Sequence, residues 1–294
     1  MHINVHLKEK MGLGIALAGG GLKGVAHIGV LKALEELGIK PDYISGTSSG
    51  AMVAAMYAMG YTPDEIAKMT KESYKKIVRI KKRRFVKFGF KFILKKEASF
   101  QGLIDGHVVE EIVNQYAHNK GLYEMSDIKT NFAMVTVDAK TTQKCIFISK
   151  NINNKEDVKY ISDIPIGKAV RASMSFPAIF TPCEYEDFCF IDGGTVDNMP
   201  VGPLQDMGAT KTLAISFTLD EFSGKENLFS IILRACDIFS LKDVKKGQAL
   251  SNLSLEIDMS KAKLLKIDDV EDSIKHGYDE VMKNKEKILG MVEV

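Results

Sequence analysis

The chain has 294 residues and a formal net charge of +2, and 45% of its residues are hydrophobic and 27% charged. This balance indicates a globular protein with a sizeable core, and no apolar run approaches the ~18 residues that suggest a membrane span. The polar start Met1–Lys10 argues against a signal peptide, and four cysteines with no C-x-x-C pair and no H-E-x-x-H motif argue against a disulfide framework or a zinc site. We therefore expect a reduced, cytoplasmic protein that needs no metal or other cofactor.

The first half of the chain alternates strand-like and helix-like segments. Short apolar runs predict strands at Gly14–Ala18 and Asp42–Ser45. Apolar residues at a spacing of three predict a helix over Val25–Leu37, and Gly38 fits its C-terminal stop. The run Ala51–Met59 is apolar almost all round, which predicts a helix buried in the middle of a domain.

A helix start and a strongly basic segment come next. Thr62–Glu65 offers a threonine cap, a proline at the first helical position and a glutamate that closes a capping box. The segment Lys75–Lys96 then contains eleven Lys or Arg residues and no acidic residue. It also contains four phenylalanines: Phe85, Phe88, Phe90 and Phe92. Because the whole chain is only +2, this positive charge is a local feature.

The second half adds shorter segments of both kinds. Strands are predicted at Phe132–Val137, Lys144–Ser149, Phe188–Ile191, Thr212–Phe217 and Leu253–Ile257. Helices are predicted at Gly106–Tyr116, Pro165–Ser173, Leu228–Phe239 and Asp272–Ile288. Repeated strand–helix units without a linker predict one domain over 1–294, built as a three-layer α/β/α sandwich around a mostly parallel sheet.

Two glycine-flanked turns are the first candidates for chemistry. Gly46–Gly50 has the G-x-S-x-G form of a nucleophile elbow, a tight strand-to-helix turn that would expose the hydroxyl of Ser48. Gly19–Gly24 follows the preceding strand, and its bare backbone N–H groups at a helix start suit a developing oxyanion. Because neighbouring parallel strands end at the same edge of a sheet, we expect the two turns to lie side by side.

The glycine-rich loop alone also fits nucleotide binding. Gly19, Gly21 and Gly24 satisfy G-x-G-x-x-G, the dinucleotide fingerprint. That fingerprint requires an acidic residue after the second strand, but Ser45–Ser48 contains none. A Walker loop requires Ser or Thr after its lysine, whereas Lys23 is followed by glycine. Both nucleotide interpretations are therefore disfavoured.

A serine nucleophile needs a base, and the chain offers two candidates. His276 is the only late histidine, but its polar, helix-like surroundings predict a surface position. Asp192 ends a predicted strand, and Gly193 and Gly194 keep other side chains away from it. A plain Asp-Gly turn is the alternative. Free aspartate has a pKa of about 3.9, so burial beside Ser48 would have to make this carboxylate a better base.

Together, these motifs resemble the signature blocks of patatin-like phospholipases. The matching segments, in the order of that family, are Gly19–Gly24, Gly46–Gly50, Ala172–Phe180 with Pro182, Asp192–Gly194 and Asp197–Pro200. The resemblance covers Leu13–Phe217. We therefore expect a motif-bearing core over about 13–217 and a C-terminal extension over 218–294 that packs on this core.

The resemblance implies a metal-independent lipid acyl hydrolase with a Ser–Asp dyad. Ser48 matches the nucleophile of the family and Asp192 its general base. The oxyanion and substrate-binding set comprises Gly19, Gly20, Gly21, Lys23 and Ser49. Lys23 stands where the family often has arginine, and it lacks the planar fork of a guanidinium group.

The basic segment suggests a membrane surface as the place where the substrate is met. Anionic headgroups attract such residues by about 1 kcal/mol each, and the phenylalanines of Lys75–Lys96 can enter the interface. We therefore expect peripheral contact with anionic membranes that salt weakens. A solvated helix face or a flap beside the site is the alternative. No nucleic-acid motif accompanies the segment, so no nucleic-acid partner is expected.

The function that follows is carboxylic ester hydrolysis of the phospholipase A or lysophospholipase type, with a phospholipid or another acyl ester as substrate. Two alternatives stay open. The same site could transfer the acyl group to an alcohol or thiol, and a protein without catalysis could bind membrane lipid through the basic segment. Nothing in the pattern specifies an oligomeric state.

Overall fold

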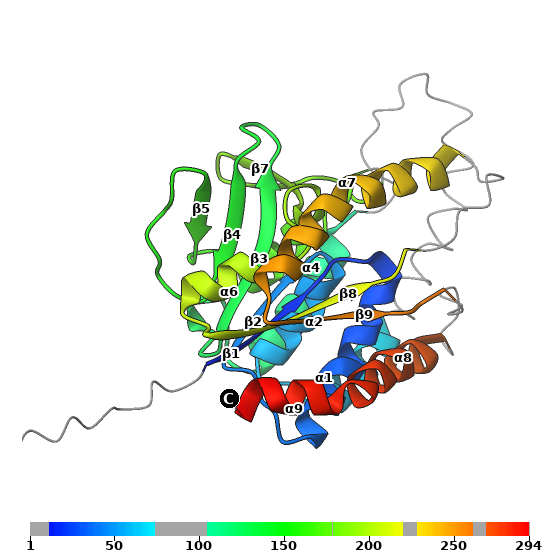
Figure 1. Ribbon diagram of the computed structural model, residues 1–294. Coiled ribbons are helices and arrows are strands. Elements are labelled where there is room, and N and C mark those ends of the chain that lie inside the picture. The colour runs from blue at the N-terminus through cyan, green and yellow to red at the C-terminus, as the bar shows by residue number, and fades with distance from the viewer. Residues whose placement is uncertain (1–11, 74–104, 178, 220–227, 261–268, 294) are drawn as a thin grey trace, which may run out of the picture.

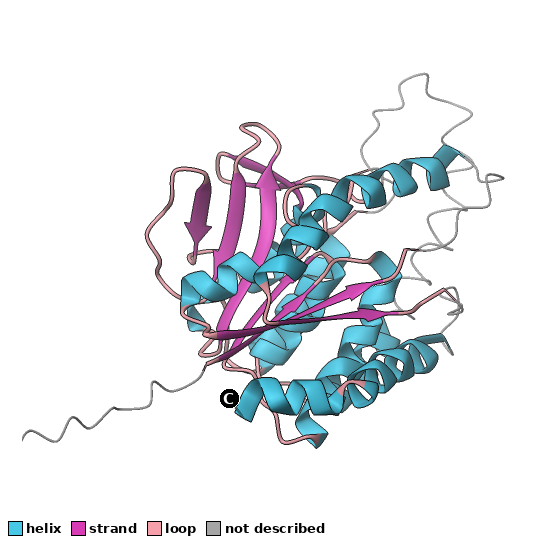
Figure 2. Ribbon diagram, viewed as in Figure 1, coloured by secondary structure: helices cyan, strands magenta, loops and turns pink. Residues whose placement is uncertain are grey.

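The computed structural model describes residues 12–73, 105–177, 179–219, 228–260 and 269–293. Within these residues, nine strands form one mixed sheet that has helices on both faces (Figures 1 and 2). The main path of the sheet runs in the order β5-β4-β3-β2-β1-β8-β9. The predicted α/β sandwich with a mostly parallel central sheet is confirmed.

Parallel strands make up the centre of the sheet. β1 (Leu13–Leu17) lies between β2 (Tyr43–Thr47) and β8 (Lys211–Phe217) and runs parallel to both. β3 (Asn131–Asp138) lies beyond β2, and β9 (Leu253–Ile257) lies beyond β8, again in parallel. The carboxyl ends of these five strands therefore share one edge of the sheet, where open α/β proteins bind ligands.

The other strands are short and mostly antiparallel to their neighbours. β4 (Lys144–Ile148) runs antiparallel to β3, and β5 (Val158–Ile161) runs parallel to β4. β6 (Cys183–Tyr185) and β7 (Phe188–Asp192) form a hairpin, and β7 also pairs antiparallel with β3. Because β4 occupies one edge of β3, β2 and β7 both pair with its other edge, one after the other.

The helices form two layers, one on each face of the sheet. One layer contains α1 (Ala26–Glu36), α2 (Ser49–Ala58), α4 (His107–Asn119), α5 (Ile166–Ser173), α8 (Asp269–Lys283) and α9 (Lys285–Glu293). The other contains α6 (Val201–Met207) and α7 (Leu228–Leu250), which lie across the sheet from α1, α8 and α9 in Figure 1.

The strand residues alternate between two hydrophobic cores because successive side chains point to opposite faces. In β1, Ile15 and Leu17 belong to the larger core, which the first helix layer covers. Ala16 and Ala18 belong to the smaller core beneath α6. The small residues on that side allow α6 to approach the sheet near the site described below.

Most predicted elements are present, and the differences have local causes. The helix predicted to end at Phe239 continues to Leu250, because Val244 and Gly247 still pack against the domain after the apolar pattern fades. The helix predicted over Asp272–Ile288 is two helices, α8 and α9, that meet at Asn284. β5, β6 and α6 were not predicted, since elements of three to seven residues have too little periodicity to detect.

The described part of residues 218–294 packs on the rest of the chain. β9 extends the sheet, and α8 packs closely against α1.

Lys75–Lys96 lies outside the described residues. At the edge of this gap the predicted capping box is present, since the Thr62 N–H donates to Glu65 Oε2 at 2.8 Å and the Glu65 N–H donates to Thr62 Oγ1 at 3.3 Å. Across the described residues, no helix combines the length and apolar character needed to span a membrane.

Candidate active site

The candidate site forms where two strands meet end to end on one edge of β3. β2 runs parallel to β3 and ends with Thr47 opposite Val135. β7 approaches in the opposite direction and ends with Asp192 opposite Thr136, the next residue of β3. The register of β3 therefore places the residue after β2, Ser48, beside the last residue of β7.

Ser48 adopts a strained conformation at the turn between β2 and α2. Its φ is 54° and its ψ is −122°, a combination that non-glycine residues rarely adopt. The flanking glycines leave room for the turn. A Cβ atom on Gly46 would lie 2.5 Å from the carbonyl oxygen of Gly50, and one on Gly50 would lie 2.2 Å from the Leu17 carbonyl oxygen. This is the geometry of a nucleophile elbow, with the serine half-buried at its tip.

The Ser48 hydroxyl donates a hydrogen bond to Asp192 Oδ2 at 2.6 Å. The other oxygen of this carboxylate, Oδ1, accepts the Gly194 N–H at 2.8 Å. Asp192 is 1% exposed, and this burial raises its pKa from 3.8 to about 6, although both hydrogen bonds favour the charged form. The carboxylate is thus ionised at neutral pH and more basic than an exposed aspartate.

The other candidate base lies elsewhere. His276 belongs to α8, the helix that packs against α1, and its Nε2 lies 3.8 Å from Asp272 Oδ2 of the same helix. It is half-buried rather than fully exposed. The structure brings Ser48 together with Asp192 and pairs this histidine with a neighbour on its own helix.

The glycine-rich loop lies beside the elbow, as expected for turns after adjacent parallel strands. The Gly20 N–H donates to Ser49 Oγ at 3.1 Å, and the Gly19 N–H lies 3.4 Å from the Asn198 carbonyl oxygen. Within the described part of the chain, the N–H groups of Gly21 and Ser49 make no protein hydrogen bond. Gly21 is exposed and has a φ of 58°, so its amide is accessible to a ligand.

Lys23, the cation of this loop, points toward the end of β8. Its ammonium group donates to the Thr218 carbonyl oxygen at 3.3 Å. A Cβ atom on the next residue, Gly24, would lie 2.3 Å from Ser49 Oγ. The loop and the elbow therefore pack closely, and the lysine fastens the loop to the adjacent strand.

Two serines at the C-terminal end of α5 contact both halves of the Ser48–Asp192 pair, and the sequence did not reveal this. Ser173 Oγ accepts the Ser48 N–H at 3.1 Å and donates to the Val135 carbonyl oxygen at 2.7 Å. The Ser175 carbonyl oxygen accepts the Asp192 N–H at 3.1 Å. The only signal was the resemblance block Ala172–Phe180, to which no role was assigned.

A buried histidine contacts the residue before the glycine-rich loop, and no pattern in the sequence predicted this contact. His27 is completely buried, and its Nε2 lies 2.8 Å from the carbonyl oxygen of Ala18, the residue before the loop. Since a carbonyl only accepts, this nitrogen carries the proton. Burial lowers the pKa of the imidazole to about 4, so the ring is neutral near pH 7. Its ring packs 4.8 Å from that of Phe217.

The arrangement combines a serine hydroxyl, a buried carboxylate acceptor and accessible backbone N–H groups. Such a set can take a proton from the hydroxyl and stabilise negative charge on a bound carbonyl oxygen. Within the described residues, no three His, Cys, Asp or Glu side chains are grouped so that they could hold a metal ion.

Comparison with known proteins finds a family model, curated relatives and solved structures that are similar to this chain. A family model described as "Patatin-like phospholipase" matches residues 15–204. Lysophospholipase NTE1 of Meyerozyma guilliermondii is 26% identical over 205 residues, which cover 69% of this chain but only 12% of that protein. An uncharacterized protein of Acanthamoeba polyphaga mimivirus is 31% identical over 215 residues, covering 69% of this chain and 64% of that protein. The crystal structure of VipD from Legionella pneumophila superposes with a TM-score of 0.45 at 13% identity, covering 93% of this chain and 66% of that chain.

Proposed function

The chain belongs to the patatin-like phospholipase family, and on that premise we propose that it is a serine-dependent lipid acyl hydrolase. The observation that carries the proposal is the 2.6 Å hydrogen bond between the Ser48 hydroxyl and the buried Asp192 carboxylate. Serine is a weak nucleophile until a base takes its proton. A carboxylate whose pKa is raised to about 6 is matched to that task near neutral pH.

The proposed reaction has two steps. Asp192 takes the proton of Ser48 as the serine oxygen attacks the ester carbonyl, and the alcohol leaves with that proton. Water then attacks the acyl-serine and gives a proton to Asp192, which returns it to the Ser48 oxygen as the fatty acid leaves. No other titratable side chain is needed for this cycle.

The developing oxyanion would be held by backbone amides at the junction of the loop and the elbow. The N–H groups of Gly21 and Ser49 are among those of the loop and the elbow that make no protein hydrogen bond within the described residues. Gly20 and Lys23 would support this hole indirectly, the first through Ser49 Oγ and the second through Thr218. Removing one such donor commonly costs two to three orders of magnitude in kcat.

The substrate class proposed is a phospholipid or lysophospholipid acyl ester, since relatives bear the name lysophospholipase. Because those relatives are much longer than this chain, the headgroup and the position cleaved are left to experiment. Acyl transfer to an alcohol would use the same Ser48 ester and differ only in the acceptor.

A lipid panel tests the proposal. The wild type, Ser48→Ala and Asp192→Asn are incubated with phospholipids and lysophospholipids, and the products are identified by mass spectrometry. We expect the wild type to release fatty acid and both variants to release it at least about 10³-fold more slowly. Circular dichroism should show that each variant is folded. Release by Ser48→Ala at the wild-type rate would rule out the dyad. Products appearing only with an added alcohol would indicate a transferase, and binding without products would indicate a lipid-binding protein.

A further inference from the structure

α7 crosses the molecule next to the proposed dyad. It packs against η3 (Gly193–Thr195), the turn that immediately follows Asp192. Burial raises the pKa of the Cys236 thiol, and the charges of Asp237 and Asp192 add to this effect, so the middle of α7 lies near the carboxylate. Farther along, Gly247 packs against Met199, where a Cβ atom would come within 2.3 Å of that side chain.

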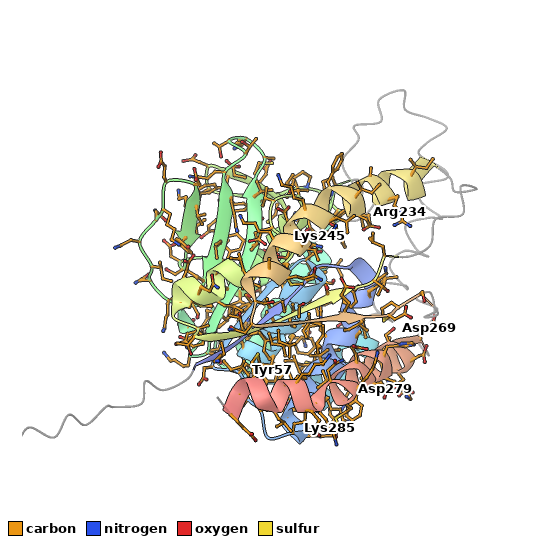
Figure 3. All side chains as sticks on the ribbon, viewed as in Figure 1. Tyr57, Arg234, Lys245, Asp269, Asp279 and Lys285 are labelled. Carbon is orange, nitrogen blue, oxygen red and sulfur yellow. The ribbon has the colours of Figure 1, made fainter. Side chains whose placement is uncertain are left out.

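α7 has an inner and an outer face. The inner face carries Cys236, Asp243 and Gly247. Asp243 and Gly247 come seven and eleven residues after Cys236, spacings that place all three on one side of a helix, and this side lies against the domain. The opposite side of the helix carries Ile231, Ile238, Lys242 and Lys245. Successive residues of this set are seven, four and three positions apart, so they lie on one side. Figure 3 labels Lys245 and Arg234 along this helix.

Among the side chains of α7 that the structure describes, three large exposed apolar residues precede three exposed lysines; Asp237 and Leu250, the last residue of the helix, are exposed as well. Ile231 is 48% exposed, Ile238 56% and Phe239 75%. One to two turns later, Lys242, Lys245 and Lys246 are exposed. A surface helix normally exposes polar residues, so large apolar side chains followed by three lysines indicate an interaction site.

We propose that this α7 outer face binds an anionic lipid surface. We define the face by six exposed residues: Ile231, Ile238, Lys242 and Lys245 on the side opposite Cys236, and Phe239 and Lys246 on the flank of the helix beside them. The apolar side chains would enter the boundary between headgroups and acyl chains, and the lysines would lie against anionic headgroups. The proposal rests on the proposed function. A lipid surface bound to α7 would lie near Ser48 and Asp192, because α7 packs against the turn that follows Asp192.

Charge favours a lipid surface over a second copy of the chain. The outer face carries three lysines, and the acidic residues of the same stretch are only Asp237 and Asp243, the second of which lies on the inner face. Two such faces would repel each other, whereas an anionic bilayer complements them. At 1.5 Å per residue, the stretch from Ile231 to Lys246 is about 22 Å long, enough to contact several headgroups.

Vesicle binding by the full-length protein tests the proposal. Sedimentation would use vesicles of phosphatidylcholine alone and vesicles that also contain phosphatidylglycerol. We expect the double variant Ile238→Ser, Phe239→Ser to partition at least about tenfold more weakly onto both kinds. Replacing Lys242, Lys245 and Lys246 by Gln should weaken binding to the anionic vesicles by roughly fivefold per lysine and leave phosphatidylcholine binding nearly unchanged.

Two controls separate this proposal from the proposed function. Tyr123→Ser removes an aromatic side chain that is 60% exposed outside α7, and it should bind vesicles like the wild type. Hydrolysis of a soluble short-chain ester should be unchanged in all α7 variants, because none of them alters the dyad. Wild-type vesicle binding by Ile238→Ser, Phe239→Ser would overturn the α7 proposal even if ester hydrolysis is intact. A concentration-dependent dimer that these substitutions abolish, with no vesicle binding, would also overturn it.

Discussion

The proposed chemistry of the site depends on one carboxylate whose surroundings oppose its charge. Asp192 is 1% exposed, and among the described residues only the Ser48 hydroxyl and the Gly194 N–H donate hydrogen bonds that compensate for its lost hydration. Its pKa of about 6 is a result of that burial. The same burial that makes the carboxylate a better base also costs folding free energy when the group is ionised.

The first consequence is a pH dependence of activity. The base works only when it is deprotonated, so kcat/KM should rise with pH and level off above an apparent pKa of about 6. The measurement is hydrolysis of a soluble ester from pH 4 to 8. A midpoint near 3.8, the value of an ordinary aspartate, would contradict the role of burial.

The second consequence is a trade between activity and stability. The pKa of Asp192 is higher in the folded protein than in the unfolded chain, so binding of its proton stabilises the folded state. This contribution to the free energy of unfolding is fully present below pH 3.8 and is lost as the pH rises through 6. Asp192→Asn removes this loss. At pH 8 we expect its free energy of unfolding, measured with denaturant, to exceed that of the wild type by on the order of 2 kcal/mol. Near pH 4 the two proteins should be equally stable. Equal stability at both pH values would contradict this account.

Ser173 should position the nucleophile rather than stabilise the fold generally. It is buried, and its hydroxyl joins the Ser48 N–H to the Val135 carbonyl. We expect Ser173→Ala to lower kcat on the order of 10- to 100-fold with little change in KM, because Ser48 loses the contact that holds its strained backbone. Urea unfolding followed by circular dichroism should show a loss of about 1 kcal/mol in the free energy of unfolding.

A neighbouring serine is the matched control for this prediction. Ser175 is equally buried and donates to the Arg171 carbonyl oxygen at 2.9 Å, but its hydroxyl does not contact Ser48. Ser175→Ala should therefore cost similar stability and leave kcat nearly unchanged. Equal losses of kcat in both variants would assign a purely structural role to Ser173.

The residues that could be predicted are those whose role has a local signal. The glycines around Ser48 and Asp192 mark turns in the sequence itself. Ser173 and His27 act through contacts to Ser48 and Ala18 that depend on strand register and on the path of a helix. No local pattern encodes such contacts, so they became visible only in three dimensions.

At the scale of elements, apolar periodicity predicted the long helices and the central strands. It missed the β6–β7 hairpin as a unit, and with it the antiparallel approach that brings Asp192 to the end of β2. It also missed that α1 and α8 touch backbone to backbone. A Cβ atom on Gly29 would lie 1.8 Å from the Ile274 carbonyl oxygen, and one on Gly277 would lie 1.9 Å from that of Ala26.

This close crossing makes α8 part of the stability of the whole domain. We expect Gly29→Ala to destabilise the protein by roughly 3 kcal/mol, because two helix backbones would have to separate. Gly290→Ala in α9 is the control, since its Cβ would meet nothing within 4 Å, and it should stabilise by about 0.5–1 kcal/mol. Urea unfolding measures both. A Gly29→Ala protein as stable as the wild type would show that α8 does not pack as described.

At the scale of the molecule, the alternation of strands and helices was enough to predict the sandwich. The mixed part of the sheet was not predicted, because strand order depends on pairings between distant segments such as β3 and β7. Lys75–Lys96 lies outside the described residues, and its contact with anionic membranes stays a prediction. The α7 outer face would provide a second contact of the same chemistry within the described residues.

The central claim is that Asp192 activates Ser48, and a fluorophosphonate probe tests it most directly. The probe reacts covalently with activated serines, and peptide mass spectrometry locates the adduct. We expect a single adduct on Ser48 in the wild type, none in Ser48→Ala, and labelling of Asp192→Asn slower by at least about 10³-fold. Labelling of Asp192→Asn at the wild-type rate, or no adduct on Ser48 in an active preparation, would contradict the account.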